Sequence, residues 1–227
     1  MRVDRLVELR DGDMSAWVRP HLPAWAARAL VVGCGTGVHT QQLAGRFNEV
    51  LAVDPDRRLI EYAQRHRSRG NLRYDVRPLH EVTVGEDGRF DVVVALDLRR
   101  HADPDTSVAA LQHLRSLTRP EGILLLTART EPDPTSRTQR TKQSGNRSAT
   151  AWREFWDDLR HRRRPVRDAV ELLQLSHELR ACQGEAGSWT RPDWDELTTL
   201  VFPGAPVTDL ARTLALAWRA PGPWTAT

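Results

Sequence analysis

A glycine-rich turn that directly follows a short apolar run is the feature that most limits how this chain can fold. Residues 29–32 are apolar and lead into Gly33-Cys34-Gly35-Thr36-Gly37. Glycines at this spacing permit positive φ angles and let the backbone come close to a ligand. A helix beginning at about Val38 would point its free N–H groups at a bound anion. The segment therefore predicts a strand, a tight ligand-binding turn and a helix.

An acidic residue at the end of the next apolar run indicates that the ligand of this turn is an adenosine compound. Asp54 ends the apolar run 49–53 and follows Gly33 by 21 residues. A carboxylate at about this distance accepts the hydroxyls of an adenosine ribose. Val38 stands where a dinucleotide-binding motif needs its third glycine, so the spacing argues against a nicotinamide cofactor. The alternative is a purely structural turn followed by an exposed aspartate.

The remaining pattern alternates strands and helices. Asp56 is placed to cap a helix that spans 59–66, and a second helix is expected over 108–117. Further strands are expected at 72–76, 90–96, 122–127, near Val207 and at 213–218. This alternation predicts an α/β, doubly wound, mostly parallel sheet with helices on both faces.

The segments outside this alternation suggest covers for the sheet. Residues 1–28 are expected to form an N-terminal helical cover that Pro20 and Pro23 break. Residues 29–130 and 196–227 are expected to form the core domain. Between them, residues 131–195 are predicted to form a loop and a helical substrate lid, with helices over 152–159 and 166–180. A further short helix is expected over 193–200, across the boundary with the core domain.

Composition limits the partners and the compartment. The calculated pI is 9.4 but the formal net charge is only +3. Residues 135–167 hold ten Arg/Lys against three Asp/Glu, a run that is usually a solvated face and alternatively a polyanion site. Cys34 and Cys182 have neither metal-ligand spacing nor the number for a disulfide framework. We predict a cytoplasmic protein with no metal and no membrane segment, and leave its oligomeric state open, a homodimer included.

Four segments resemble, in order and spacing, the class I S-adenosylmethionine-dependent methyltransferases, in particular the small-molecule branch related to the ubiquinone/menaquinone methyltransferases. They are Gly33-Cys34-Gly35-Thr36-Gly37, Val53-Asp54-Pro55, Phe90-Asp91-Val92-Val93-Val94 and Leu117-Thr118-Arg119-Pro120-Glu121-Gly122. The tail from Phe202 to Arg219 is similar to the family's last strand pair. The resemblance implies a Rossmann-like, seven-stranded sheet whose last strand is antiparallel.

The resemblance also implies a binding site for S-adenosyl-L-methionine, with S-adenosyl-L-homocysteine as the product. The glycine turn would lie along the methionine part of the cofactor, Asp54 would bind the ribose, and Pro55 would pack on the adenine. Leu96 and Asp97 would lie beside the methionine moiety and the transferred methyl group. The implied set for the cofactor is Gly33, Cys34, Gly35, Thr36, Gly37, Asp54, Pro55, Arg77, Pro78, Leu96 and Asp97.

Three positions depart from the family pattern. Val31 stands where the family usually has an acid, and Arg77-Pro78 stand where an acid would bind the adenine amine, with Asp75 two residues away. Glu121 replaces a common turn glycine. The first two departures leave open a methyltransferase-like protein without enzyme activity, or one that uses the cofactor in a non-methylating reaction.

The loop after the fourth strand holds the candidate catalytic residues, Asp97 and His101. His101 could accept a proton from the substrate, because imidazole titrates near neutral pH; the alternative is a histidine that packs the loop. Arg99 and Arg100 could bind a substrate carboxylate or phosphate, or form surface ion pairs. His177 could face the pocket or be buried with its hydrogen bonds satisfied.

Tryptophan is concentrated in the second half of the chain and bears on the substrate. Six of the eight tryptophans follow Ala151, which suggests a broad apolar acceptor pocket. The alternative is plain core packing, which already explains Trp152 and Trp156 on an amphipathic helix. We therefore expect methyl transfer to oxygen or nitrogen, with carbon less favoured, of a small hydrophobic or aromatic metabolite. An RNA or protein methyltransferase that uses the basic 135–167 segment is the alternative.

Overall fold

The computed structural model describes residues 14–24, 26–98, 104–129, 189–210 and 213–222. These all belong to one compact unit formed by residues 14–130 and 186–227. The other unit, residues 1–13 and 131–185, lies outside the described residues, as does most of the predicted lid. The described elements are α2 Met14–His21, β1 Ala26–Val32, α3 Val38–Leu43, β2 Phe47–Asp54, α4 Arg57–His66, β3 Leu72–Val76, α5 Val84–Asp87, β4 Phe90–Leu98, α6 Pro104–Leu117, β5 Thr118–Arg129, α9 Arg191–Val201, β6 Val207–Leu210 and β7 Thr213–Arg219, with 3-10 turns at Ala44–Arg46 and Leu79–Glu81.

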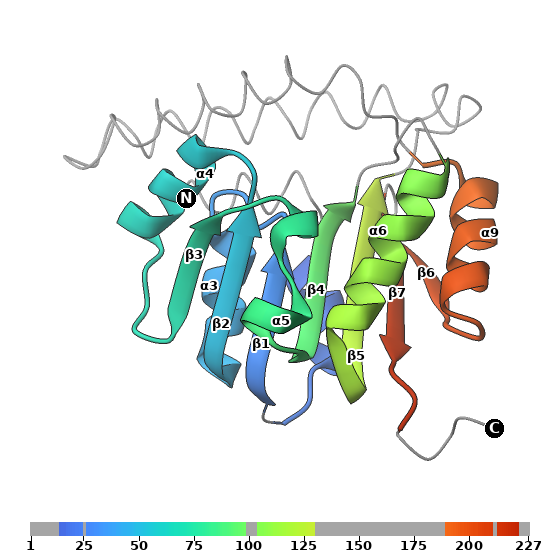
Figure 1. Ribbon diagram of the computed structural model, residues 1–227, viewed down its shortest axis with the longest axis horizontal. Coiled ribbons are helices and arrows are strands. Elements are labelled where there is room, and N and C mark those ends of the chain that lie inside the picture. Colours follow the sequence, from blue (N-terminus) through green and yellow to red (C-terminus); the bar gives the residue numbers. More distant parts are fainter. Residues whose placement is uncertain (1–13, 25, 99–103, 130–188, 211–212, 223–227) are drawn as a thin grey trace, which may run out of the picture. The chain divides into compact units, whose positions relative to one another are not determined.

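The strands form one seven-stranded sheet in the order β3-β2-β1-β4-β5-β7-β6 (Figure 1). β1 pairs in parallel with β2 on one side and with β4 on the other, so Ala29 lies between Val50 and Val92. β7 is antiparallel to both β5 and β6. The predicted fold class, a mostly parallel sheet with an antiparallel last strand, is confirmed. Because the chain order reverses at β1, the turn after this strand opens at the edge where such folds bind ligands.

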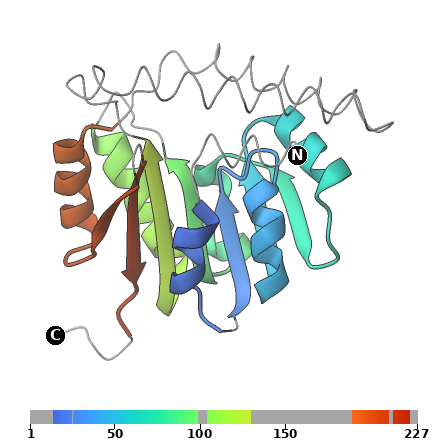
Figure 2. The same cartoon turned by 180° about the vertical axis from the view of Figure 1, so that it is seen from behind.

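Helices cover both faces of the sheet and bury a separate apolar cluster on each. α5 and α6 lie on the near face in Figure 1, with α9 beside α6. α2 and α3 lie on the opposite face, as Figure 2 shows. Central strands such as Val92–Ala95 are buried on both sides, which explains their uninterrupted apolar sequence.

Within the described residues, the helix and strand predictions hold, with shifted ends; the helices predicted over 152–159 and 166–180 lie outside these residues. The Asp56 carboxylate accepts a hydrogen bond of 2.9 Å from the Arg58 amide and so caps α4 as expected. α9 begins at Arg191 rather than 193, because the Thr190 hydroxyl caps it by accepting from the Asp193 amide. Pro20, expected to break the first helix, lies inside α2 near its end. β1 begins at Ala26, within the segment that was predicted to be a helical cover.

Glu121 is a local exception within β5. Its φ angle is +63°, the only positive value among the non-glycine residues that the structure describes. The Glu121 amide donates to the Ala220 carbonyl at 3.1 Å, which ties the start of β5 to the end of β7. An L-residue in this conformation costs roughly 1–2 kcal/mol, and this explains why glycine suits the position.

Candidate cofactor site

The turn after β1 is held by backbone hydrogen bonds to the end of β2. The amides of Gly33 and Cys34 both donate to the Val53 carbonyl, at 2.9 and 3.2 Å. The Gly37 amide donates to the Cys34 carbonyl at 3.0 Å and closes the turn. The predicted turn and the helix from Val38 are therefore both present, at the carboxyl edge of the sheet (Figure 1).

Two glycines of the turn are required for different reasons. A Cβ on Gly33 would lie 2.9 Å from the Leu96 carbonyl oxygen, so a side chain here would push the turn away from β4. Gly35 has a φ angle of +54°, and a Cβ built on it would meet no atom within 4 Å. The backbone at Gly35 thus borders open space, which is where a ligand could approach it.

Asp54, at the end of β2, joins this turn to the first turn of α4. Its carboxylate accepts a 3.0 Å hydrogen bond from the Gly35 amide at Oδ2 and a 2.9 Å bond from the Asp56 amide at Oδ1. Each oxygen has a second acceptor site, so the carboxylate retains capacity for two hydroxyl donors. Burial raises the pKa of Asp54; the two amide bonds lower it in part, and the Asp56 charge raises it.

Cys34, in the middle of the turn, carries a buried thiol. It is 7% exposed, and burial followed by the nearby Asp54 charge raises its pKa well above the usual value. A neutral thiol in this place contributes packing. Thr36 is half-buried and Pro55 exposed, so both of these predicted contacts border solvent.

The charged residues of β3 and of the segment after it already form ion pairs with one another. The Arg77 guanidinium bonds both carboxylate oxygens of Asp87, at 2.8 and 3.2 Å, and forms an ion pair of 3.3 Å with Asp75. Asp75 also pairs with Arg73 at 2.9 Å. Asp75, weighed as a substitute adenine ligand, and Arg77 therefore neutralise each other. The Arg77 side chain joins β3 to α5, and half-buried Pro78 follows it.

β4 brings Leu96 to the glycine turn, as the proximity of its carbonyl to Gly33 shows. The backbone of Asp97 belongs to β4, but its side chain lies outside what the structure describes. His101, Arg99, Arg100 and His177 also lie outside the described residues, so their predicted roles stay predictions.

The sequence reasoning missed Tyr74 of β3 as part of the turn's surroundings. Its ring packs against Gly37, and its hydroxyl lies 3.5 Å from the Gly37 carbonyl. Burial raises the Tyr74 pKa above its usual range, so the hydroxyl stays protonated. Its inward position between Leu72 and Val76 in an alternating strand was the available signal.

Three of the tryptophans expected near a substrate pocket belong to the core. Trp189 and Trp194 are 1% and 0% exposed, and Trp218 is 9% exposed, all within the cluster beneath α6 and α9. For these residues the plain packing interpretation is correct. Trp152, Trp156 and Trp224 lie outside the described residues.

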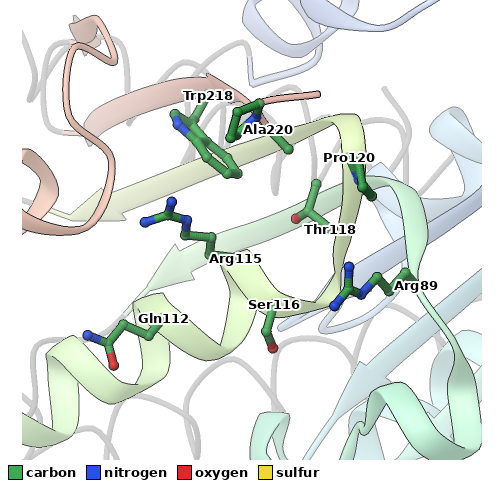
Figure 3. Close-up of a pocket in the computed structure, with 9 residues that line it drawn as sticks. Arg89, Gln112, Arg115, Ser116, Thr118, Pro120, Trp218 and Ala220 are labelled. Atoms are coloured by element: carbon green, nitrogen blue, oxygen red, sulfur yellow. The ribbon is translucent and has the colours of Figure 1, made fainter. Parts of the chain in front are cut away.

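A pocket of about 290 Å³ lies at the opposite edge of the sheet, where β5 begins and β7 ends (Figure 3). One of its two arginines, Arg115, donates to the Val201 carbonyl at 2.9 Å and lies over the Trp218 ring at 5.2 Å. None of the predicted site residues lines this pocket. It is therefore separate from the candidate cofactor site.

Two other functional features are absent from the described part of the chain. No group of three or more His, Cys, Asp or Glu side chains is arranged to hold a metal ion there. None of the helices in the same ranges is long and apolar enough to cross a membrane.

Together, the strand order, the antiparallel β7, the glycine turn after β1 and the acid ending β2 define a Rossmann-like methyltransferase fold of class I. Residues 29–122 match the family model described as a methyltransferase domain. Over these residues, less than half of the chain, the match agrees with the methyltransferase family that the motifs resemble.

Individual relatives agree with this assignment at low identity. The ubiquinone biosynthesis O-methyltransferase of Acinetobacter baylyi is 27% identical over 103 residues, which cover 43% of each chain. The N-methyltransferase NodS of Bradyrhizobium japonicum superposes with a TM-score of 0.57 at 16% identity, over 97% of this chain and 99% of NodS. A DhpI–S-adenosylhomocysteine complex gives 0.58 at 20% identity, over 92% and 83%. The chain spans less than half the length of the curated relatives that it matches first.

Proposed function

We propose that this protein transfers a methyl group from S-adenosyl-L-methionine to an oxygen or nitrogen, less readily a carbon, of a small hydrophobic or aromatic molecule. The observation that carries the proposal is the open backbone at Gly35 beside a buried carboxylate that keeps two acceptor sites. The matched relatives named as O-methyltransferases and the DhpI complex with S-adenosylhomocysteine support it.

The residues of this edge fit the cofactor. The methionine part of the cofactor would lie along the glycine turn, formed by Gly33, Cys34, Gly35, Thr36 and Gly37. A ligand can approach this backbone because Gly35 has no side chain and borders open space. Asp54 would accept the ribose hydroxyls on its remaining acceptor sites. Pro55 would pack on the adenine. Arg77 and Pro78 would contact the adenine through their backbone, since the Arg77 guanidinium is bound to Asp87.

When bound, the cofactor supplies an activated methyl group that leaves its sulfur by in-line displacement. The chain's part is to hold the acceptor in line with that group, which can be worth ~7–11 kcal/mol of the barrier. Leu96 and Asp97 would form the wall beside the reacting centre, because β4 ends next to the glycine turn. His101 would accept the proton that a hydroxyl or amine acceptor loses.

Transfer of a tritiated methyl group from labelled S-adenosylmethionine to a set of phenols, catechols and amines tests the acceptor class. We expect label on an aromatic hydroxyl or amine. We also expect His101→Gln to lower kcat by about a hundredfold or more, the smaller end of a general base's effect, with unchanged affinity for S-adenosylhomocysteine. No transfer to any of these acceptors would contradict the proposal.

The second candidate function is methyl transfer to RNA or protein. It is motivated by the basic 135–167 segment, which could bind such an acceptor. Label found on RNA, with binding that falls steeply with salt and disappears when Arg162, Arg163 and Arg164 become Ala, would favour that acceptor. The small-molecule proposal predicts that this triple variant transfers methyl groups as the wild type does.

A further inference from the structure

β4 is irregular where it reaches the candidate site. Ala95 pairs with Leu126 of β5, and the next pair is Leu98 with Ala128. Between these two pairs β4 advances by three residues and β5 by only two. The extra residue is a β-bulge at Leu96–Asp97, the two β4 residues assigned to the cofactor site. A bulge next to a site bends the strand locally and changes the direction of its side chains, so contacts beside the bulge affect the geometry of the site.

One side of this bulge is fixed by a tryptophan from a distant part of the sequence. The Trp189 indole Nε1–H donates a hydrogen bond of 2.9 Å to the Leu98 carbonyl, immediately after the bulge. Trp189 is 1% exposed, so water cannot replace this bond without a rearrangement. On the other side of the bulge, the Leu96 carbonyl borders Gly33 of the glycine turn.

Trp189 is itself held in place by α9. It directly precedes Thr190, whose hydroxyl caps this helix and whose carbonyl accepts from the Trp194 amide at 3.1 Å. The Trp189 and Trp194 rings meet edge to face, with centroids 5.2 Å apart and planes at 79°. Trp194 is wholly buried on the α9 face that packs into the core. The indole N–H of Trp189 is thus presented from a rigid base.

We propose that Trp189 is a positioning residue that fixes the β4 bulge, and through it the placement of Leu96 and Asp97 against the methyl donor. The inference rests on the proposed function, because it assigns that bulge to the cofactor site. It adds a residue outside the matched family segment, which ends at residue 122. The geometry joins α9 to the reacting edge through one hydrogen bond.

The neighbouring tryptophan supplies a matched control. Trp194 is equally buried, but its indole Nε1–H has no hydrogen-bond partner among the described residues. Trp189→Phe and Trp194→Phe each remove one pyrrole ring from the same cluster. Only Trp189→Phe also removes a hydrogen bond to β4.

The test compares both variants and the wild type by calorimetric titration with S-adenosylhomocysteine, and by hydrogen exchange of the β4 backbone amides. We expect Trp189→Phe to bind about tenfold more weakly, and its amides around Leu96 to exchange roughly tenfold faster, the effect of one lost buried hydrogen bond. Trp194→Phe should match the wild type in both. Equal values for the two variants would overturn the proposal, since packing alone would then explain them.

A third readout uses the wild type alone and does not depend on either variant folding. The Trp189 indole proton should be strongly protected from exchange in a ¹⁵N spectrum and should shift when S-adenosylhomocysteine is added. Fast exchange of that proton would refute the proposal. If the wild type binds no S-adenosylhomocysteine, the proposed function fails, whereas the exchange rates around Leu96 still decide whether Trp189 holds the bulge.

Discussion

At the scale of single residues, Asp54 combines two tasks that the chemistry of a carboxylate makes compatible. One acceptor site of each oxygen holds the protein's own backbone, at Gly35 and Asp56, and the other stays available for a ligand. An asparagine could not do both, because its NH₂ group would face one of the two amide donors. The glycine turn and the carboxylate proposed to bind the ribose are therefore joined by a hydrogen bond, and are not two independent motifs.

The pH dependence of binding should report this carboxylate. The folded-state pKa of Asp54 is raised above the ordinary aspartate value, and only the ionised form keeps all of its acceptor sites. We expect the affinity for S-adenosylhomocysteine to be constant near neutral pH and to fall as the solution is acidified through that raised pKa. Titrations at several pH values would show this; an affinity that rises on acidification would contradict it.

A second residue-scale prediction concerns Glu121. Glycine adopts a positive φ without the steric cost that Glu121 bears, although glycine loses more backbone entropy on folding. We expect Glu121→Gly to stabilise the fold by about 0.5–1 kcal/mol, which for a chain of this size raises the Tm by a few degrees. Scanning calorimetry measures it. A lower Tm in Glu121→Gly would show that Glu121 makes a compensating contact.

At the scale of elements, the Arg77–Asp87 pair joins the end of β3 to α5 and to the turn before it. Burial raises the pKa of Asp87, but the Arg77 hydrogen bond, the Thr83 amide and the Arg77 and Arg73 charges together bring it below the usual value. A carboxyl group with a lowered pKa in the folded state adds stability above its ordinary pKa and loses it as the pH falls. The connection is therefore strongest at neutral pH.

We predict that Arg77→Met destabilises the protein by about 1–3 kcal/mol at pH 7, less than for a fully buried pair because Arg77 is partly exposed. The difference from the wild type should shrink below about pH 4, where Asp87 becomes protonated in the unfolded chain. Denaturation with urea at both pH values tests this. The same variant should keep its affinity for S-adenosylhomocysteine, and a loss greater than tenfold would mean that the Arg77 side chain contacts the adenine.

At the scale of the whole molecule, the sequence predicts the layers well because buried parallel strands are apolar without interruption. Val92–Ala95 and Leu124–Leu126 are such runs, and both are central strands. The strand order and the antiparallel β7 came from resemblance to a family. Periodicity alone does not fix which strands are neighbours.

The finer geometry could not be predicted, because it depends on backbone angles and on contacts between distant residues. The Gly35–Asp54 bond requires the left-handed turn, and the Trp189–Leu98 bond joins residues 91 positions apart. Trp189, Trp194 and Trp218 showed the same signal as a lining of aromatic residues, yet they pack the core. Amino-acid composition alone does not distinguish a tryptophan that packs in the core from one that lines a substrate pocket.

The central claim is that the turn at Gly35 and the Asp54 carboxylate together bind S-adenosylmethionine and its product. Calorimetric titration of the protein with S-adenosylhomocysteine, with Asp54→Ala as the comparison, tests it most directly. The account predicts one site per chain in the wild type and at least tenfold weaker binding in Asp54→Ala, since hydrogen bonds to a charged acceptor are worth about 1.5–3 kcal/mol each. No measurable heat with the wild type, or equal affinity in the two proteins, would contradict it.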